Sequence, residues 1–108
     1  VLTNHGGRQL DGAISPMETL AEIADACGDV LDIYIDGGFR RGTDVAKALA
    51  LGARAVMLGR PLLYGVAAAG QPGVAKALEI LRSELVRAMG LLGVPRVGEL
   101  TRAHLRAA

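Results

Sequence analysis

Residues 31–44, Leu-Asp-Ile-Tyr-Ile-Asp-Gly-Gly-Phe-Arg-Arg-Gly-Thr-Asp, join a short apolar run to a glycine-rich turn and the start of a helix. The β-branched run Leu31–Ile35 predicts a strand. After the turn, Thr43 or Asp44 is expected to cap a helix. This helix should run over 45–51, with Gly52 ending it. A strand followed directly by a helix is one βα unit, from which parallel sheets are built.

The residues before this unit predict the end of another strand and another helix. Val1–Thr3 has the apolar character of a buried strand end. Ser15 is expected to cap the helix, with Pro16 at its first position and Glu18 completing a capping box. Apolar residues then recur at helical spacing until Gly28, which is expected to end the helix.

The residues after this unit repeat the pattern. Ala55–Leu58 predicts a second buried strand, which ends at a glycine and an arginine. Residues 61–69 predict a short helix and residues 70–73 a turn. A long amphipathic helix is expected over 74–92, ended by the Gly-Val-Pro sequence at 93–95.

Composition restricts the class of protein. The chain has 108 residues, 51% of them hydrophobic, with no Trp and a net charge of +1. A core of Ala, Val, Leu and Ile suits helices packed on a parallel sheet, and so weak a charge argues against a nucleic-acid-binding protein. Cys27 is the single cysteine, which excludes an internal disulfide and suits a reducing compartment. With no signal peptide or spanning segment recognised, we expect a cytoplasmic location, or a peripheral one at the inner face of the membrane.

Repeated βα units predict a parallel sheet with right-handed crossovers. The functional-looking turns all follow strand ends, so they should lie together at the carboxyl edge of this sheet. This is the active face of a (β/α) barrel, where the loops after the last strands commonly hold phosphate. A doubly wound sheet also binds ligands at this edge, but the turns lack the GxGxxG pattern, which places that fold second.

The turn after the first strand end carries a base and a cation. The imidazole of His5 could remove a proton, and Arg8 could hold a carboxylate through two parallel hydrogen bonds. Between them, Gly6 and Gly7 would let a substrate approach the backbone. The alternative is a turn whose histidine only bonds a backbone carbonyl. The nearby Asn4, glycines and arginine favour a catalytic site.

The next turns suit an anion. Asp36–Gly38 offers backbone amides, with Arg40 beside them and a helix start close behind. Gly59 and Arg60 repeat this arrangement one strand later. The alternative is that the glycines only turn the chain and the arginines are solvated. Two such turns in consecutive βα units favour a phosphate site.

These motifs together resemble the FMN-dependent α-hydroxy acid oxidoreductases, which include glycolate oxidase, lactate oxidase and lactate or mandelate dehydrogenases. The resemblance covers essentially the whole chain. The motifs that carry it are Asn-His-Gly-Gly-Arg-Gln-Leu-Asp at 4–11, Asp-Gly-Gly-Phe-Arg-Arg-Gly-Thr-Asp at 36–44, Ala-Leu-Ala-Leu-Gly-Ala at 48–53 and Leu-Gly-Arg-Pro at 58–61.

The resemblance implies a residue-by-residue assignment of the site. His5 matches the active-site base, and Arg8 matches the arginine that binds the substrate carboxylate. The positions that match the family's contacts to the ribityl chain and phosphate of FMN are Asp36, Gly37, Gly38, Arg40, Gly59 and Arg60. No metal ligands are implied.

The resemblance also implies a TIM (β/α)8 barrel and a reaction. Residues 1–108 are expected to be the C-terminal fragment of a single FMN-binding barrel domain, from the end of strand 6 through strand 8 and helix 8. The implied reaction oxidises an L-2-hydroxy acid of the lactate, glycolate or mandelate class to the 2-oxo acid. The expected partners are this substrate, the upstream part of the barrel and, by family analogy, further copies of the chain. Alternatives are another FMN-binding barrel enzyme or a non-catalytic fragment, because an isolated fragment would lack the upstream part of the site.

Overall fold

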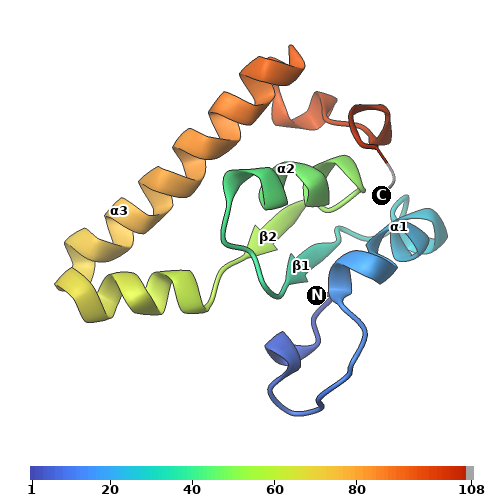
Figure 1. The fold of residues 1–108 in the computed structure, drawn as a ribbon. Helices are drawn as coiled ribbons and strands as arrows, with labels where there is room; N and C mark the ends of the chain where they lie inside the picture. The colour runs from blue at the N-terminus through green and yellow to red at the C-terminus, as the bar shows by residue number, and fades with distance from the viewer. Residues whose placement is uncertain (107–108) are drawn as a thin grey trace.

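The computed structural model describes residues 1–106 and contains a small parallel sheet. Strand β1 (Tyr34–Asp36) pairs with β2 (Ala55–Met57) in parallel, with Ile35 opposite Val56. On the other side of β1, Leu2 forms a parallel bridge with Ile35. The backbone of Leu2 both donates to Tyr34 O, at 2.7 Å, and accepts from Asp36 N, at 2.9 Å. β1 therefore lies between the first residues of the chain and β2, as Figure 1 shows.

Helices connect and cover these strands. Helix α1 (Pro16–Cys27) packs on β1, α2 (Gly42–Ala50) packs on β2, and α3 (Arg60–Leu92) packs on α2 (Figure 1). Short 3₁₀ turns are η1 (His5–Gly7), η2 (Val97–Glu99) and η3 (Arg102–His104). The predicted alternation of strands and helices is confirmed. Within residues 1–106, no helix combines the length and apolarity that crossing a membrane requires.

Some element boundaries differ from the prediction. The strand expected over 31–35 is paired only over Tyr34–Asp36, and Leu31 is exposed. Helix α2 begins at Gly42 instead of Val45, and its cap residue is Arg41, so the predicted cap at Thr43 or Asp44 is wrong. The helix starts earlier because the Asp44 carboxylate, inside the first turn, accepts the backbone N–H of both Arg40 and Arg41 at 3.1 and 3.0 Å.

The capping box predicted at the start of α1 is wrong. Ser15 and Pro16 do occupy the cap and the first helical position, but the Ser15 side chain makes no capping bond. Instead the backbone N–H of Glu18 donates to Ser15 O at 3.0 Å. The start of the helix is therefore stabilised by this backbone hydrogen bond and by Pro16, whose fixed φ is already helical.

Helix α3 is sharply bent, and the bend divides it into two arms (Figure 1). Ala69 and Gly70 leave helical geometry, with φ of −156° and +60°. This confirms the break predicted between a short and a long helix, although Pro72 is already helical and suits the first turn of the second arm. Gly65 and Gly73 lie in direct backbone contact across the bend.

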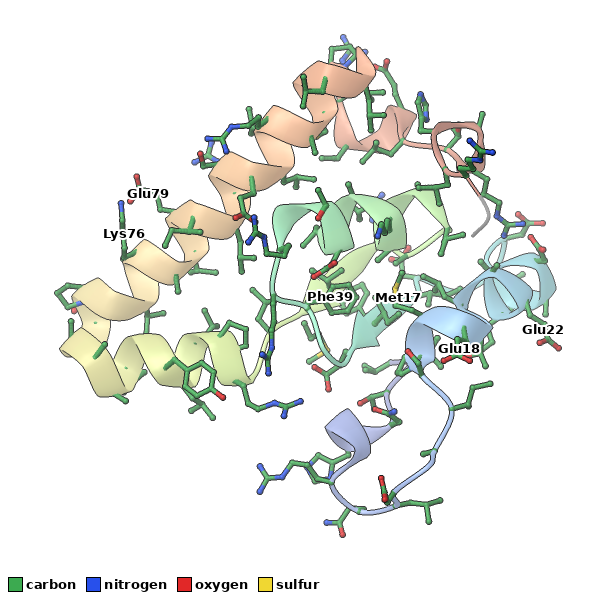
Figure 2. All side chains as sticks on the ribbon, in the orientation of Figure 1. Met17, Glu18, Glu22, Phe39, Lys76 and Glu79 are labelled. Atoms are coloured by element: carbon green, nitrogen blue, oxygen red, sulfur yellow. The ribbon has the colours of Figure 1, made fainter. Side chains whose placement is uncertain are left out.

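The core consists of two clusters. The first lies between the sheet, α1 and α2, where Leu20 and Ile35 are fully buried and Phe39 is 3% exposed. Figure 2 shows Phe39 beside Met17 of α1, which packs against this cluster together with Cys27. The second cluster joins α2, α3 and the C-terminal residues through Ala46, Ala50, Met89, Val94 and Leu100. The first cluster supports the carboxyl edge of the sheet, where the predicted site residues lie.

Candidate active site

Every predicted site residue lines one cavity of about 190 Å³ at the carboxyl edge of the sheet. These residues are His5, Arg8, Asp36, Gly37, Gly38, Arg40, Gly59 and Arg60. They come from η1, the end of β1 and the start of α3, segments far apart in sequence. A larger groove of about 440 Å³ between α2, α3 and the C-terminal residues contains none of them. Because the predicted base, arginines and glycine turns all converge in the smaller cavity, we take it as the candidate site.

The turn that carries His5 is tight and locally strained. His5 has φ +57°, and it is the sole non-glycine residue with positive φ in residues 1–106. The turn is closed by Gly7 N on Asn4 O at 3.1 Å and by Arg8 N on His5 O at 3.3 Å. A non-glycine residue in this conformation costs about 1 kcal/mol or more, and such residues concentrate at functional sites.

Thr3 connects the His5 turn to Asp36, and the sequence analysis did not single it out. Its hydroxyl oxygen accepts the backbone N–H of His5 at 3.0 Å, and the hydroxyl donates to Asp36 Oδ2 at 2.9 Å. The other carboxylate oxygen of Asp36 makes no hydrogen bond within the described residues. Asp36 therefore anchors the histidine turn and retains an oxygen that can accept a hydroxyl group.

Gly6 brings the first and third turns together. A Cβ atom added at Gly6 would lie 3.2 Å from Nη2 of Arg60, so the guanidinium rests directly on this glycine. Gly6 also has φ +64°, a conformation that side chains disfavour. Gly6 was expected to let a substrate approach the backbone, whereas in the structure the group that approaches it is the Arg60 guanidinium.

The start of α2 does not offer free amides to an anion, which corrects one part of the expected phosphate site. The N–H groups of Arg40 and Arg41 donate to Asp44, and that of Gly42 donates to Glu84 Oε2 at 2.8 Å. Protein carboxylates thus already occupy the positive end of this helix. An anion in the cavity is left with the arginine side chains and the glycine turn.

The glycine turn after β1 is open toward the cavity. Gly37 and Gly38 have φ of +127° and +80°. Within residues 1–106, neither donates its backbone N–H to another protein group. The lining also carries the guanidinium groups of Arg8, Arg40 and Arg60 against the single carboxylate of Asp36. The cavity is therefore cationic and suited to anionic groups.

Apolar residues complete the lining, and the sequence analysis assigned none of them to the site. They are Phe39, Met57, Pro61 and Leu63. Met57 is the last residue of β2, Phe39 directly follows Gly38, and Pro61 and Leu63 come shortly after Gly59. The sequence feature that could have placed these four residues at the site is therefore their closeness to the glycine turns.

Comparison with known proteins matches residues 1–107 to the FMN-dependent dehydrogenase family. The chain is 50% identical over 105 residues to the peroxisomal (S)-2-hydroxy-acid oxidase of Oryza sativa subsp. japonica, covering 97% of this chain and 29% of that protein. It is 48% identical to the L-lactate oxidase of Nostoc sp., with the same coverage of both chains. A soluble mutant of the membrane-associated (S)-mandelate dehydrogenase from Pseudomonas putida superposes with a TM-score of 0.95 at 50% identity, over 99% of this chain and 30% of that one.

The chain thus spans less than a third of the length of these relatives. The matching structures are FMN-dependent barrel enzymes, so the fold described above corresponds to part of a barrel. The family match extends over nearly the whole chain, and about half of the residues are identical in each of these relatives. The chain therefore belongs to the FMN-dependent dehydrogenase family.

Proposed function

We propose that the full-length protein carrying this chain is an FMN-dependent enzyme that oxidises an L-2-hydroxy acid to the 2-oxo acid. The observation that supports this most is the single cavity that gathers His5 and Arg8 with Arg40 and Arg60. A base beside a carboxylate clamp suits a 2-hydroxy acid, and a separate pair of cations suits a phosphate group.

The residues present fit FMN. Arg40 and Arg60 have the planar, multiply donating groups that bind phosphate oxygens, and the glycine turn leaves room for close approach. The unpaired oxygen of Asp36 suits a hydroxyl of the ribityl chain. About 190 Å³ is less than a whole cofactor needs, so these residues would hold its phosphate and ribityl portion. When bound, FMN supplies the acceptor for the two electrons that leave the substrate.

His5 and Arg8 would act on the substrate. Arg8 would hold the carboxylate through paired hydrogen bonds and so fix the orientation of the adjacent carbon. His5 would take one proton, and two electrons would leave the substrate. If His5 takes the proton of that carbon, the hydroxyl proton is released as the C=O bond forms; if it takes the hydroxyl proton, the hydrogen on carbon leaves with the two electrons as a hydride. Both routes yield the 2-oxo acid, and both use the same base and clamp.

The relatives suggest the substrate class and the place of the chain in the fold. Their names indicate oxidation of (S)-2-hydroxy acids, lactate and mandelate, and we propose a substrate of the lactate, glycolate or mandelate class here.

We further propose that residues 1–108 form the C-terminal part of a single FMN-binding barrel domain, from the end of strand 6 through helix 8. The upstream part of the barrel and further copies of the chain are the proposed protein partners, and the proposed location is cytoplasmic or peripheral at the inner membrane face.

The visible absorption spectrum of the full-length protein tests this proposal. We expect a flavin spectrum that bleaches when L-lactate, glycolate or (S)-mandelate is added without oxygen. A flavin that stays oxidised with all of these acids would count against the proposed reaction. A colourless protein that takes up no added FMN would count against the proposed cofactor.

A further inference from the structure

Glu84 joins the second arm of α3 to the start of α2. Its Oε2 accepts the backbone N–H of Gly42 at 2.8 Å, and its Oε1 lies 3.2 Å from Nη2 of Arg41. The Glu84 side chain is only 20% exposed. By contrast, Lys76 and Glu79 on the same arm pair with each other and point outward into solvent, as Figure 2 shows. Glu84 is thus the α3 carboxylate directed at the loop before α2.

The backbone contact beside this bond is equally close. Gly42 is buried, and a Cβ atom added there would lie 2.5 Å from the carbonyl carbon of Glu84. The loop residues just before Gly42 are held from the other side, because Asp44 accepts the N–H groups of Arg40 and Arg41. Two carboxylates from different helices therefore fix the backbone of residues 40–42, which carries the Arg40 side chain into the cavity.

The same helix also leads to the other arginine of the cavity. Arg60 begins the first arm of α3, and Glu84 lies on the second. The arms are held together at Gly65 and Gly73, whose backbones touch across the bend. Glu84 thus connects the helix that begins at Arg60 to the loop that carries Arg40.

We propose that Glu84 is a positioning residue that sets Arg40 relative to Arg60 for binding the phosphate of FMN. This inference rests on the proposed function of those arginines. Glu84 is absent from the cavity lining and acts through the backbone of Gly42 and the guanidinium of Arg41. A bond to a charged acceptor at a partly buried position contributes more than a neutral one, so its loss should loosen the loop.

Dissociation constants for FMN and for riboflavin, which lacks the phosphate, test this role in the full-length protein by quenching of flavin fluorescence. Glu84→Ala should weaken FMN binding about tenfold, the effect of losing one charge-assisted bond, and leave riboflavin within about twofold. Glu84→Gln keeps an oxygen that can accept from Gly42 and should stay within about threefold of wild type for FMN. Glu79→Ala, on the solvent side of the same helix, is the matched control and should change neither constant.

The outcomes separate this inference from the proposed function. Equal weakening of both flavins, or no change in either, would show that Glu84 does not position the phosphate site. If Glu84→Ala does not fold, Glu84→Asp replaces it, because its shorter side chain keeps the charge but cannot reach both partners. Glu84→Asp should raise the dissociation constant for FMN at least about threefold and leave that for riboflavin unchanged. A wild-type protein that binds both flavins equally would overturn the proposed phosphate site, and this inference with it.

Discussion

His5 occupies a backbone conformation that its turn imposes. Its N–H is held by Thr3, and Thr3 is held by Asp36, so the position of the imidazole depends on the strand beside it. If His5 is the base, His5→Ala should slow flavin reduction by the hydroxy acid about 10²–10⁴-fold and leave FMN bound. Anaerobic stopped-flow absorbance measures this, with His104→Ala as the control away from the cavity. Reduction within about tenfold of wild type would contradict the role of the base.

Arg8 is the cavity cation that we assign to the substrate. Arg8→Met keeps much of the length of the side chain and removes its donors, so it should raise the KM for the hydroxy acid at least about tenfold. Steady-state kinetics with varied substrate measures this. Arg54→Met removes an exposed arginine at the amino end of β2 and should leave KM unchanged. If Arg8→Met also leaves KM unchanged, Arg8 does not bind the substrate carboxylate.

Gly6 allows a comparison of backbone strain with side-chain contact. Gly6 and Gly12 both have positive φ, at +64° and +76°, but only a Cβ at Gly6 would meet Arg60. Alanine at either position should cost about 1–2 kcal/mol of stability because of the left-handed backbone. Only Gly6→Ala should also weaken FMN binding, because it displaces the Arg60 guanidinium. Thermal unfolding and FMN titration of both variants check this, and equal FMN affinity in the two would refute the Arg60 contact.

At this scale, residue types at strand ends were predictable from the sequence and their connections were not. The site's base and cations each come after an apolar run and a glycine or asparagine; they are His5, Arg8, Arg40 and Arg60. Because parallel strands end at the same edge of a sheet, such positions must lie together. Glu84 lies inside a long amphipathic helix, where its sequence environment resembles that of solvent-facing glutamates. Its bond spans 42 positions, and only the folded structure defines such a pair.

Among the elements, α3 contributes most to the geometry of the site. One helix supplies Arg60 at its beginning and Glu84 in its second arm, and the bend at Ala69–Gly70 turns the second arm back over α2. The Gly-Gln-Pro-Gly sequence at 70–73 predicted this break. The two arms touch at Gly65 and Gly73, and Gly65 lies inside the first arm with no turn signal around it. The existence of the elements was therefore predictable from local sequence, but their closest packing was not.

The contact between the arms can be tested with a pair of substitutions in α3. A Cβ at Gly65 would lie 2.7 Å from the carbonyl oxygen of Gly73, whereas one at Gly90 would meet nothing within 4 Å. Gly65→Ala should therefore destabilise the full-length protein by about 1–3 kcal/mol through overpacking. Gly90→Ala should stabilise it by about 0.5–1 kcal/mol through helix propensity. Denaturant unfolding of both variants measures this, and a neutral or stabilising Gly65→Ala would show that the arms are not closely packed.

Across the whole molecule, the C-terminal residues connect α3 to α1. Val94 and Leu100 are buried in the second core cluster, against α2. Beyond them, Arg102 reaches Asp25 of α1 with bonds of 3.0 and 2.7 Å, and it also donates to the carbonyl oxygen of Ala21 at 3.1 Å. This connection fixes α1 to the C-terminal residues, and Figure 1 shows α2 and the sheet lying between α1 and α3. No local pattern predicted it, because the ionic partners lie 77 positions apart.

The ion pair should give the protein a specific dependence on pH. Hydrogen bonding to Arg102 holds the pKa of Asp25 below its ordinary value of 3.8. A lowered pKa in the folded state means that the unfolded state binds more protons, so the contribution is complete well above pH 3.8 and is lost as pH falls through the folded pKa. The thermal midpoint of Asp25→Asn should therefore lie below that of wild type at pH 7 and converge with it toward pH 3.

Salt and a second carboxylate provide the controls for this prediction. Because both side chains of the pair are exposed, about 1 M NaCl should also reduce the difference in thermal midpoint. Asp29→Asn, an exposed carboxylate in the loop after α1, is the control and should show no such convergence. A difference between Asp25→Asn and wild type that stays constant from pH 7 to 3 would show that the pair does not stabilise this connection.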